Sequence, residues 1–373
     1  MSNHIPFEIQ IEILKKLPVK SVMRFRSVSK PWKSLIDSSR FVSDYNQRQT
    51  QPLLLITYED PCKDGLKYLS VVDDDDDNLS KQMCDMSPFL SNSAKEMIQP
   101  TLVSSSQGLL CLYDDNFSKQ MCYRAIIWNP WIRKSVTVTF PNFDYHNYGC
   151  VVGFGVCPKT SDPKLVKVTF PESFSSMEPW KIEVYSLSSG FWRSRSFSKI
   201  SDVPCESLNF APPSECVDGF IYWIAYCKDV SKLYWVIISF DLTNEEFGVI
   251  YLPDFLKCCY ILGLSKHRES LVLLPHDYTS GYDSGVWMME GGVTKTFRKL
   301  FTINSTDDGV NRMAISDKGE AILEMVESYR KENVASIGTY EYSSDSFNRT
   351  RITQICGFAF MSSYMETMLL HDY

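Results

Sequence analysis

A strand pattern recurs at similar intervals along most of this 373-residue chain. Its repeats are anchored by five aromatic residues, namely Trp128, Tyr185, Phe240, Trp287 and Tyr340. Successive anchors are separated by 57, 55, 47 and 53 residues. A repeat of this length, made of short strands and polar turns, is typical of the four-stranded blades of a β-propeller. The pattern therefore predicts a large all-β domain that closes on itself.

Segments with the two-residue alternation of strands begin at residue 53 and continue to the C-terminal region. No convincing amphipathic helix lies between them. Segments 53–72 and 357–370 lie outside the repeats and could pair with each other as a closing blade. The expected number of blades is then about six, with five or seven left open.

The first 45 residues have the longer period of helices. Ile5, Ile9 and Ile13 recur every four residues, Leu14 and Leu17 widen the apolar stripe, and Pro6 suits the first turn. Pro18 ends this helix, and further helices are expected from Val19 and from Ser29. The chain is therefore expected to be an α+β multidomain protein, with an all-α domain at 1–46 and an all-β domain at 47–373.

These short helices carry more large apolar side chains than a 40-residue cluster can bury within itself. The excess needs a cover, which is either the rest of this chain or a separate protein. The charge also divides the chain, because residues 1–50 carry a balance of +5 and the remaining 323 residues carry −12. Such asymmetry indicates two different modules.

Composition and apolar patterning exclude several classes of protein. Hydrophobic residues make up 44% of the chain, so disorder over most of its length is excluded. The longest strongly apolar runs have eight residues, far short of a membrane-spanning helix, and no membrane association is expected. The twelve cysteines show no zinc-binding spacing, which favours free thiols in a cytoplasmic or nuclear protein.

No catalytic or metal-binding motif stands out, so no cofactor and no metal are expected. Gly153-Phe154-Gly155 lacks the third glycine and the following helix of a dinucleotide-binding motif. Asp73 to Asp77 read as an acidic loop rather than a cation site. The basic residues near the N-terminus are interpreted as the solvent-exposed face of a helix. Nucleic-acid binding is not expected, because the rest of the chain is acidic and would repel phosphate.

The N-terminal segment resembles an F-box through its whole length. The matching residues are Ile5-Pro6-Phe7-Glu8-Ile9, Ile13-Leu14, Leu17-Pro18-Val19-Lys20-Ser21-Val22, Arg24-Phe25-Arg26-Ser27-Val28-Ser29-Lys30, Trp32, Leu35-Ile36 and Ser39-Arg40-Phe41. It departs from the family pattern at Ile5, where leucine is usual, and at Ser39-Arg40, where Ser-Pro is common. Neither change threatens the fold.

The rest of the chain resembles the F-box-associated interaction domain of plant F-box proteins, a kelch-type propeller family that includes the S-locus F-box proteins. The matching stretches are Ser106 to Cys111, Trp128-Asn129-Pro130, Gly153-Phe154-Gly155, Val217 to Trp223, Ser239 to Leu242 and Tyr364-Met365-Glu366-Thr367. Val156-Cys157-Pro158 departs from the tyrosine and aspartate usual before this proline. The layout is compatible with an S-locus member without being diagnostic.

The resemblance implies a non-enzymatic substrate receptor of an SCF-type cullin-RING ubiquitin ligase, in which the F-box binds a Skp-family adaptor and the β-domain binds a target protein. It assigns to the adaptor contact Ile5, Pro6, Ile9, Ile13, Leu14, Leu17, Pro18 and Val22. It assigns to the internal core of the F-box Phe25, Val28, Trp32 and Leu35. The positive charge of residues 1–50 would also speed association with an acidic partner.

Target binding is expected on loops of the propeller, where a rigid scaffold presents variable segments. Candidate anchors are Tyr145, Tyr148, Trp180, Tyr278 and Tyr282, although each could equally be ordinary blade packing. The alternative function is a propeller that binds a small ligand or sugar, with the helices packed on their own β-domain.

Overall fold

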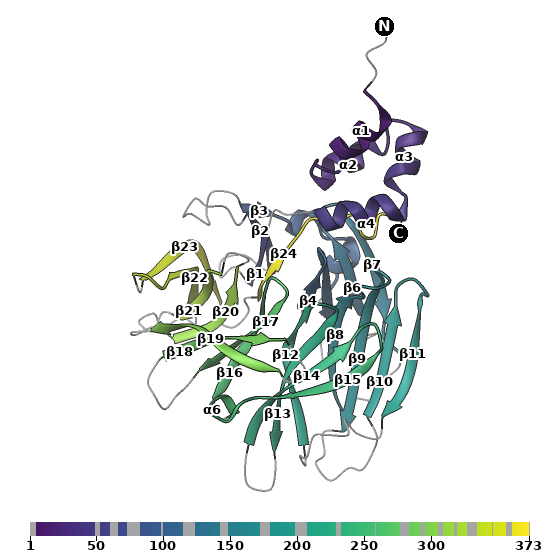
Figure 1. Ribbon diagram of the computed structural model, residues 1–373. Helices are drawn as coiled ribbons and strands as arrows, with labels where there is room; N and C mark the ends of the chain where they lie inside the picture. The colour runs from purple at the N-terminus through teal and green to yellow at the C-terminus, as the bar shows by residue number, and fades with distance from the viewer. Residues whose placement is uncertain are drawn as a thin grey trace.

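A computed structural model of the chain shows a small group of helices seated on one end of a β-propeller (Figure 1). The structure describes residues 5–372 except 49–52, 60–65, 73–82, 98–99, 115–123, 142–147, 172–179, 198–206, 229–232, 258, 277–282, 292–294, 305–308, 317–318, 327–333, 345 and 356–359. Among the described helices, none has the length and apolar character that crossing a membrane requires.

The described strands form six four-stranded antiparallel sheets, each of which is one blade. Blade 1 contains β24 (Phe360–Tyr364), β1 (Leu53–Glu59), β2 (Leu66–Val72) and β3 (Met83–Asp85). Blade 2 contains β4 (Pro100–Ser106), β5 (Leu109–Asp114), β6 (Arg124–Asn129) and β7 (Lys134–Thr139). Blade 3 contains β8 (Tyr148–Val156), β9 (Pro163–Pro171), β10 (Trp180–Ser186) and β11 (Phe191–Phe197).

The other three blades have the same strand order. Blade 4 contains β12 (Ser207–Val217), β13 (Phe220–Lys228), β14 (Leu233–Asp241) and β15 (Glu246–Tyr251). Blade 5 contains β16 (Tyr260–His267), β17 (Ser270–His276), β18 (Asp283–Glu290) and β19 (Thr296–Asn304). Blade 6 contains β20 (Gly309–Ile315), β21 (Ala321–Val326), β22 (Val334–Glu341) and β23 (Ser346–Ile355).

The closing blade pairs the two ends of the propeller, as the sequence predicts. The C-terminal strand β24 pairs antiparallel with β1, with Leu53 opposite Tyr364 and Thr57 opposite Phe360. This pairing covers an edge of the first blade and confirms the expectation of six blades. All five aromatic anchors lie in the third strand of blades 2 to 6, which explains their regular spacing.

The first strand of each blade lies next to the axis and carries many small or polar residues. Ser104, Ser105 and Ser106 of β4 are buried, and so is Ser362 of β24. The glycines of β8 serve blade packing, because a Cβ on Gly153 would lie 2.3 Å from the Trp223 ring of blade 4. Gly153-Phe154-Gly155 is therefore a site of close contact between blades.

The helices before the propeller are α1 (Phe7–Leu14), α2 (Val19–Phe25), α3 (Lys30–Ile36) and α4 (Ser39–Arg48). Residues 5–48 are called the helical domain below, and they end two residues beyond the predicted boundary. Pro6 and Pro18 immediately precede α1 and α2, and Ser29 caps α3 by accepting a 3.3 Å hydrogen bond from the Trp32 N–H. Short helical turns in the propeller are η1 (Ser87–Phe89), α5 (Asn92–Lys95) and α6 (Asp254–Lys257).

Among the described residues, the contacts of the helical domain with the propeller lie at one end, which is called the helix-bearing face. This face carries short turns such as 130–133, 157–162 and 187–190. Because the strands are antiparallel, the connection from the second to the third strand of blades 2 to 6 begins and ends at the opposite face. Several of these connections are long, including 115–123, 172–179 and 327–333.

Candidate functional site

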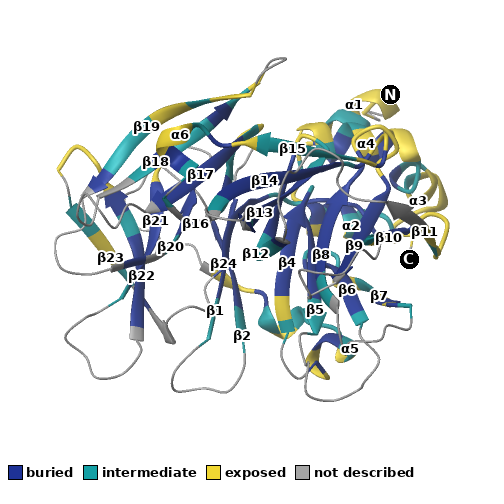
Figure 2. Ribbon diagram, turned by 90° about the horizontal axis from the view of Figure 1, so that it is seen from below, coloured by how far each residue is buried: buried dark blue, intermediate teal, exposed yellow. Residues whose placement is uncertain are grey.

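Helix α1 presents apolar side chains to solvent. Ile5, Ile9 and Ile13 are 52%, 51% and 46% exposed, and Phe7 is also exposed. In Figure 2 the strands are mostly buried, whereas exposed residues gather on the helices. Ile5, Ile9 and Ile13 recur every four residues and are called the apolar face below, whereas Phe7 lies on the other side of α1. Isolated exposed apolar residues are common on proteins, but a group of three large ones on one side of a short segment is typical of an interaction surface.

The interior of the helical domain is closed on the other side of the same helix. Leu14 and Val22, which the resemblance assigns to the adaptor contact, are 2% and 0% exposed. They belong to a core that also contains Val19, Ile36, Phe41, Val42, Tyr45 and Met368. The structure thus corrects this part of the assignment. The apolar residues of α1 extend around two sides of the helix. One side, with Leu14, is buried in the core, and the other, with Ile13, is exposed.

The four residues predicted for the core of the helical domain differ in how far they are buried. Phe25 and Leu35 are half-buried against the core, and Trp32 packs edge-on against Phe25 with ring centroids 5.0 Å apart. Val28 is 65% exposed, so its assignment to the core is wrong. It lies in the connection between α2 and α3, where its side chain points away from the packed helices.

The connector between α1 and α2 is exposed at Pro18 and half-buried at Leu17. Leu17 packs against the core, and its carbonyl accepts a 2.8 Å hydrogen bond from the hydroxyl of Tyr45 on α4. Burial raises the pKa of Tyr45 far above its ordinary value, and the charge of Glu366 acts in the same direction. Tyr45 is therefore a neutral donor that fixes the connector against α4.

The helical domain shares its core with the propeller. Met368, which follows β24, is fully buried among the helices, and Trp131 and Ile132 of the β6–β7 turn pack against the same cluster. Glu366 Oε2 accepts a 2.8 Å hydrogen bond from the backbone N–H of Val19. The alternative in which the helices pack on their own β-domain is therefore true for α2 and α4, while the apolar face of α1 stays uncovered.

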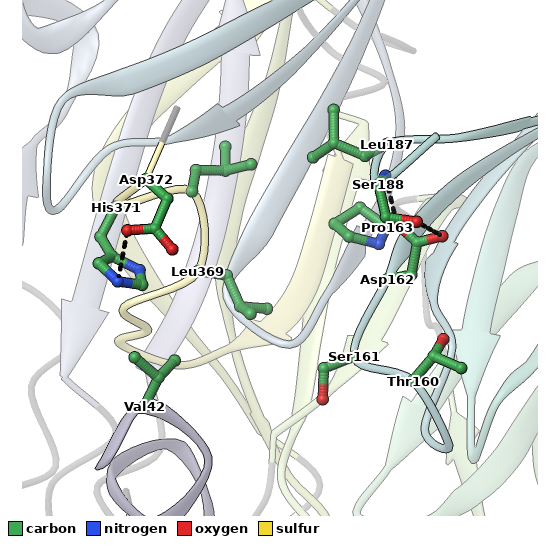
Figure 3. Close-up of a pocket in the computed structure, with 11 residues that line it drawn as sticks. Val42, Thr160, Ser161, Asp162, Pro163, Leu187, Ser188, Leu369, His371 and Asp372 are labelled. Carbon is green, nitrogen blue, oxygen red and sulfur yellow. Dashed lines mark hydrogen bonds and ion pairs between the residues drawn. The ribbon is translucent and has the colours of Figure 1, made fainter. Parts of the chain in front are cut away.

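A cavity of about 160 Å³ lies in this junction. Figure 3 shows Val42 of α4 and Leu369 of the C-terminal segment on one side, with the turns that carry Asp162 and Ser188 opposite. Asp162 accepts a 2.9 Å hydrogen bond from the Ser188 N–H. The cavity is smaller than the roughly 300–1,000 Å³ usual for small-ligand sites, so it does not favour the ligand-binding alternative.

A charged cluster closes the far end of the junction. Within the described part of the chain, Asp37, His371 and Asp372 could offer ligand atoms within 4.8 Å of one another. The guanidinium of Arg26 already contacts Asp37, with Nη2 3.0 Å from Oδ2. Asp37 therefore has a positive partner within the protein, and we assign the cluster to contacts between the two domains.

Most predicted target anchors lie outside the described residues. This is so for Tyr145, Tyr278 and Tyr282, and for the side chain of Tyr148, whose backbone begins β8. Trp180 begins β10 and is half-buried at the base of the long connection 172–179. Its ring lies 5.7 Å from those of Phe170 and Phe210, so it packs between blades 3 and 4. Phe255 of α6 is an exposed aromatic residue at the face opposite the helices. The sequence analysis did not single it out.

Comparison with known proteins assigns both parts of the chain. The model of the F-box domain matches residues 3–44, and the model of the F-box associated beta propeller domain matches residues 54–373. The chain is 26% identical over 382 residues to the F-box/kelch-repeat protein At3g23880 of Arabidopsis thaliana, covering 98% of this chain and 96% of that protein. It is 24% identical over 396 residues to the F-box protein At4g11590 of the same plant, covering 100% and 91%.

Among solved structures, the β-propeller domain of the Trilobed protease from Pyrococcus furiosus aligns with a TM-score of 0.40 and 10% identity, covering 81% of this chain and 80% of that one. The two family models account for the helical domain and for the whole propeller. The chain therefore belongs to the F-box proteins that carry an F-box-associated β-propeller domain.

Proposed function

We propose that this protein is the substrate receptor of an SCF-type cullin-RING ubiquitin ligase. The apolar face carries the proposal, because Ile5, Ile9 and Ile13 remain exposed although the core of the helical domain is filled. A Skp-family adaptor is the partner that an F-box implies. Aliphatic anchors buried at an interface can each contribute ~2 kcal/mol or more to binding, so Ile9 and Ile13 can carry much of the affinity.

The adaptor contact extends from the apolar face to the connector. Exposed Pro6 immediately precedes α1, and half-buried Leu17 and exposed Pro18 form the connector that follows it. Leu14 and Val22 support this surface from below by holding α1 and α2 together. The adaptor in turn would link the chain to the cullin-RING subunits.

The chain acts in this proposal as a non-catalytic adaptor. The propeller holds a target protein, and ubiquitin transfer takes place on other subunits, where proximity raises the effective concentration of target lysines. The strand ends that flank the long connections lie at the face opposite the helices and therefore far from the proposed adaptor contact, which suits target binding there. The described cysteines are free thiols, which agrees with a place in the cytoplasm or nucleus.

Co-purification with a Skp-family adaptor tests the proposal. The double variant Ile9→Asp/Ile13→Asp should lower the affinity roughly 100-fold or more, because it places two charges where aliphatic anchors would be desolvated. Phe191→Asp is the matched control, since Phe191 is 58% exposed on the propeller. Its adaptor affinity should equal that of the unmodified chain. Equal recovery of adaptor by the double variant would refute the proposal, provided that its circular dichroism spectrum is unchanged.

A further inference from the structure

The segment that follows β24 has a fixed path on the helix-bearing face of the propeller. In Figure 1 it leaves β24 and passes next to α4. The side-chain amide of Asn129 donates hydrogen bonds to the carbonyls of Thr367 and Leu369, at 2.9 and 2.8 Å. A Cβ on Gly108 would lie 2.4 Å from the Met365 carbonyl oxygen, so the segment passes directly over this glycine. The propeller therefore determines where residues 365–372 run.

From this position the segment makes polar contacts with two helices. Glu366 accepts from the N–H of Val19, the first residue of α2, whose N–H has no partner within its own helix. The backbone N–H of Met368 donates a 3.1 Å hydrogen bond to Oδ1 of Asn46 on α4. Burial raises the pKa of Glu366, and the bond from Val19 opposes that shift. Two helices are thus tied to one segment of the propeller.

The Met368 side chain adds an apolar contact at the same place. It is 0% exposed and lies in the core of the helical domain beside Val19 and Tyr45. Leu369 instead belongs to an apolar cluster of blades 2 and 3. Adjacent residues therefore reach into the cores of the two domains, which leaves little freedom for one domain to turn against the other.

Covalent connection alone could not fix this orientation. Only residues 49–52 separate α4 from β1, and a four-residue connection limits distance without setting an angle. The apolar face lies on α1, which makes none of the polar contacts described for the C-terminal segment. Contacts that set the orientation are therefore separate from the surface proposed to bind the adaptor.

We propose that residues 366–372 form a C-terminal clamp that holds the helical domain in one orientation on the propeller, with Glu366 as a positioning residue. The purpose of the clamp rests on the proposed function. A receptor that swings freely would present target lysines over a wide range of positions, whereas a clamped receptor holds the target-binding face at a set distance and direction from the adaptor.

Two measurements on the full-length chain, free and bound to the adaptor, test the clamp. Hydrogen exchange of the Val19 amide itself reports its contact with Glu366, and small-angle X-ray scattering reports the spread of domain orientations. Glu366→Ala should make the Val19 amide exchange roughly tenfold faster or more and should broaden the distance distribution. Glu366→Gln keeps an acceptor oxygen and should restore both properties. Glu269→Ala, at an exposed turn, is the control that should change neither.

Adaptor affinity distinguishes a positioning role from general destabilisation. All three variants should bind the adaptor within about twofold of the unmodified chain, because solvent-exposed surfaces away from a substitution are little affected. Should Glu366→Ala fail to fold, Asn46→Ala and the acceptor-preserving Asn46→Asp give the same comparison at α4. Unchanged exchange and scattering in Glu366→Ala would overturn the clamp. If the unmodified chain itself does not bind the adaptor, the proposed function fails. Hydrogen exchange and scattering of the unbound chain and its variants then still test the clamp.

Discussion

The helical domain and the propeller bury their apolar side chains in different ways. Each blade packs against both neighbours, and the pairing of β24 with β1 closes the ring. The helical domain instead takes Met368, Trp131 and Ile132 from the propeller into its interior and leaves the apolar face of α1 open. The propeller buries its apolar side chains between its own blades. The helical domain needs the propeller to complete its core and leaves the apolar face of α1 for a partner. This difference separates residues that hold the fold from residues available to a partner.

The adjacent residues Ile13 and Leu14 give the largest expected contrast. Leu14→Ala removes a side chain that is 2% exposed and should lower the free energy of unfolding of the helical domain by about 2–5 kcal/mol. Ile13→Ala acts on an exposed side chain and should change that free energy by no more than ~0.5 kcal/mol. Urea unfolding followed by circular dichroism and hydrogen exchange measures both effects.

Adaptor titration of the same two variants completes the contrast. Ile13→Ala should weaken binding by roughly tenfold or more through the lost interface anchor. Leu14→Ala should weaken binding only to the extent that the helical domain unfolds. The comparison between the two sides of α1 would be wrong if Leu14→Ala reduced the affinity while stability stayed unchanged.

The sequence predicts elements whose side chains follow one clear pattern and misses those that do not. The third strands of blades 2 to 6 carry the aromatic anchors, and all were predicted. The axial strand β24 was expected only as part of the closing blade, and axial strands such as β4 give a weaker signal, because Ser104–Ser106 interrupt the alternation of apolar side chains. Where six strands converge near an axis, small side chains are favoured over the large ones that identify strands.

The candidate site was predicted in part for similar reasons. Periodicity identified the apolar stripe of α1 but could not separate exposed Ile13 from buried Leu14, since that depends on where the other helices pack. The junction gave no local signal. Glu366 and Val19 are 347 positions apart, and their hydrogen bond exists only once the propeller has closed.

Near the axis, Glu215 of β12 links the stability of the propeller to pH. It is 2% exposed, and burial raises its pKa to about 7, against the opposing charge of Lys266 and a hydrogen bond from Ser362. Between its ordinary pKa, 4.5, and 7 the folded state retains a proton that the unfolded state releases. Stability from this group therefore falls as pH rises through that window, by a total on the order of 3 kcal/mol.

The variant Glu215→Gln isolates this effect from other titrating groups. The free energy of unfolding of the variant should fall less between pH 5 and pH 8 than that of the unmodified chain. The difference in free energy between the two proteins should therefore grow with pH and level off above about 7. Urea unfolding at four pH values measures it, with Glu269→Gln as the exposed control. A difference that stays constant across this range would show that Glu215 is ionised throughout.

The smallest expected effect tests how tightly the blades fit at β8. A Cβ on Gly153 would meet Cζ2 of Trp223 at 2.3 Å, and Trp223 is fully buried between blades 3 and 4. Overpacking of this kind costs about 1–3 kcal/mol, which urea unfolding of Gly153→Ala should detect. Gly263→Ala is the control, because nothing lies within 4 Å of its added Cβ, and it should change stability by no more than ~0.5 kcal/mol.

A second background separates a steric clash from a backbone effect. Trp223→Phe removes the ring atom that the new methyl group would meet, so Gly153→Ala should cost less in this background than in the unmodified chain. A backbone effect would cost the same in both. The propeller would then tolerate the added volume, and the contrast between a tightly closed ring and an open helical surface would rest on the exposed face of α1 alone.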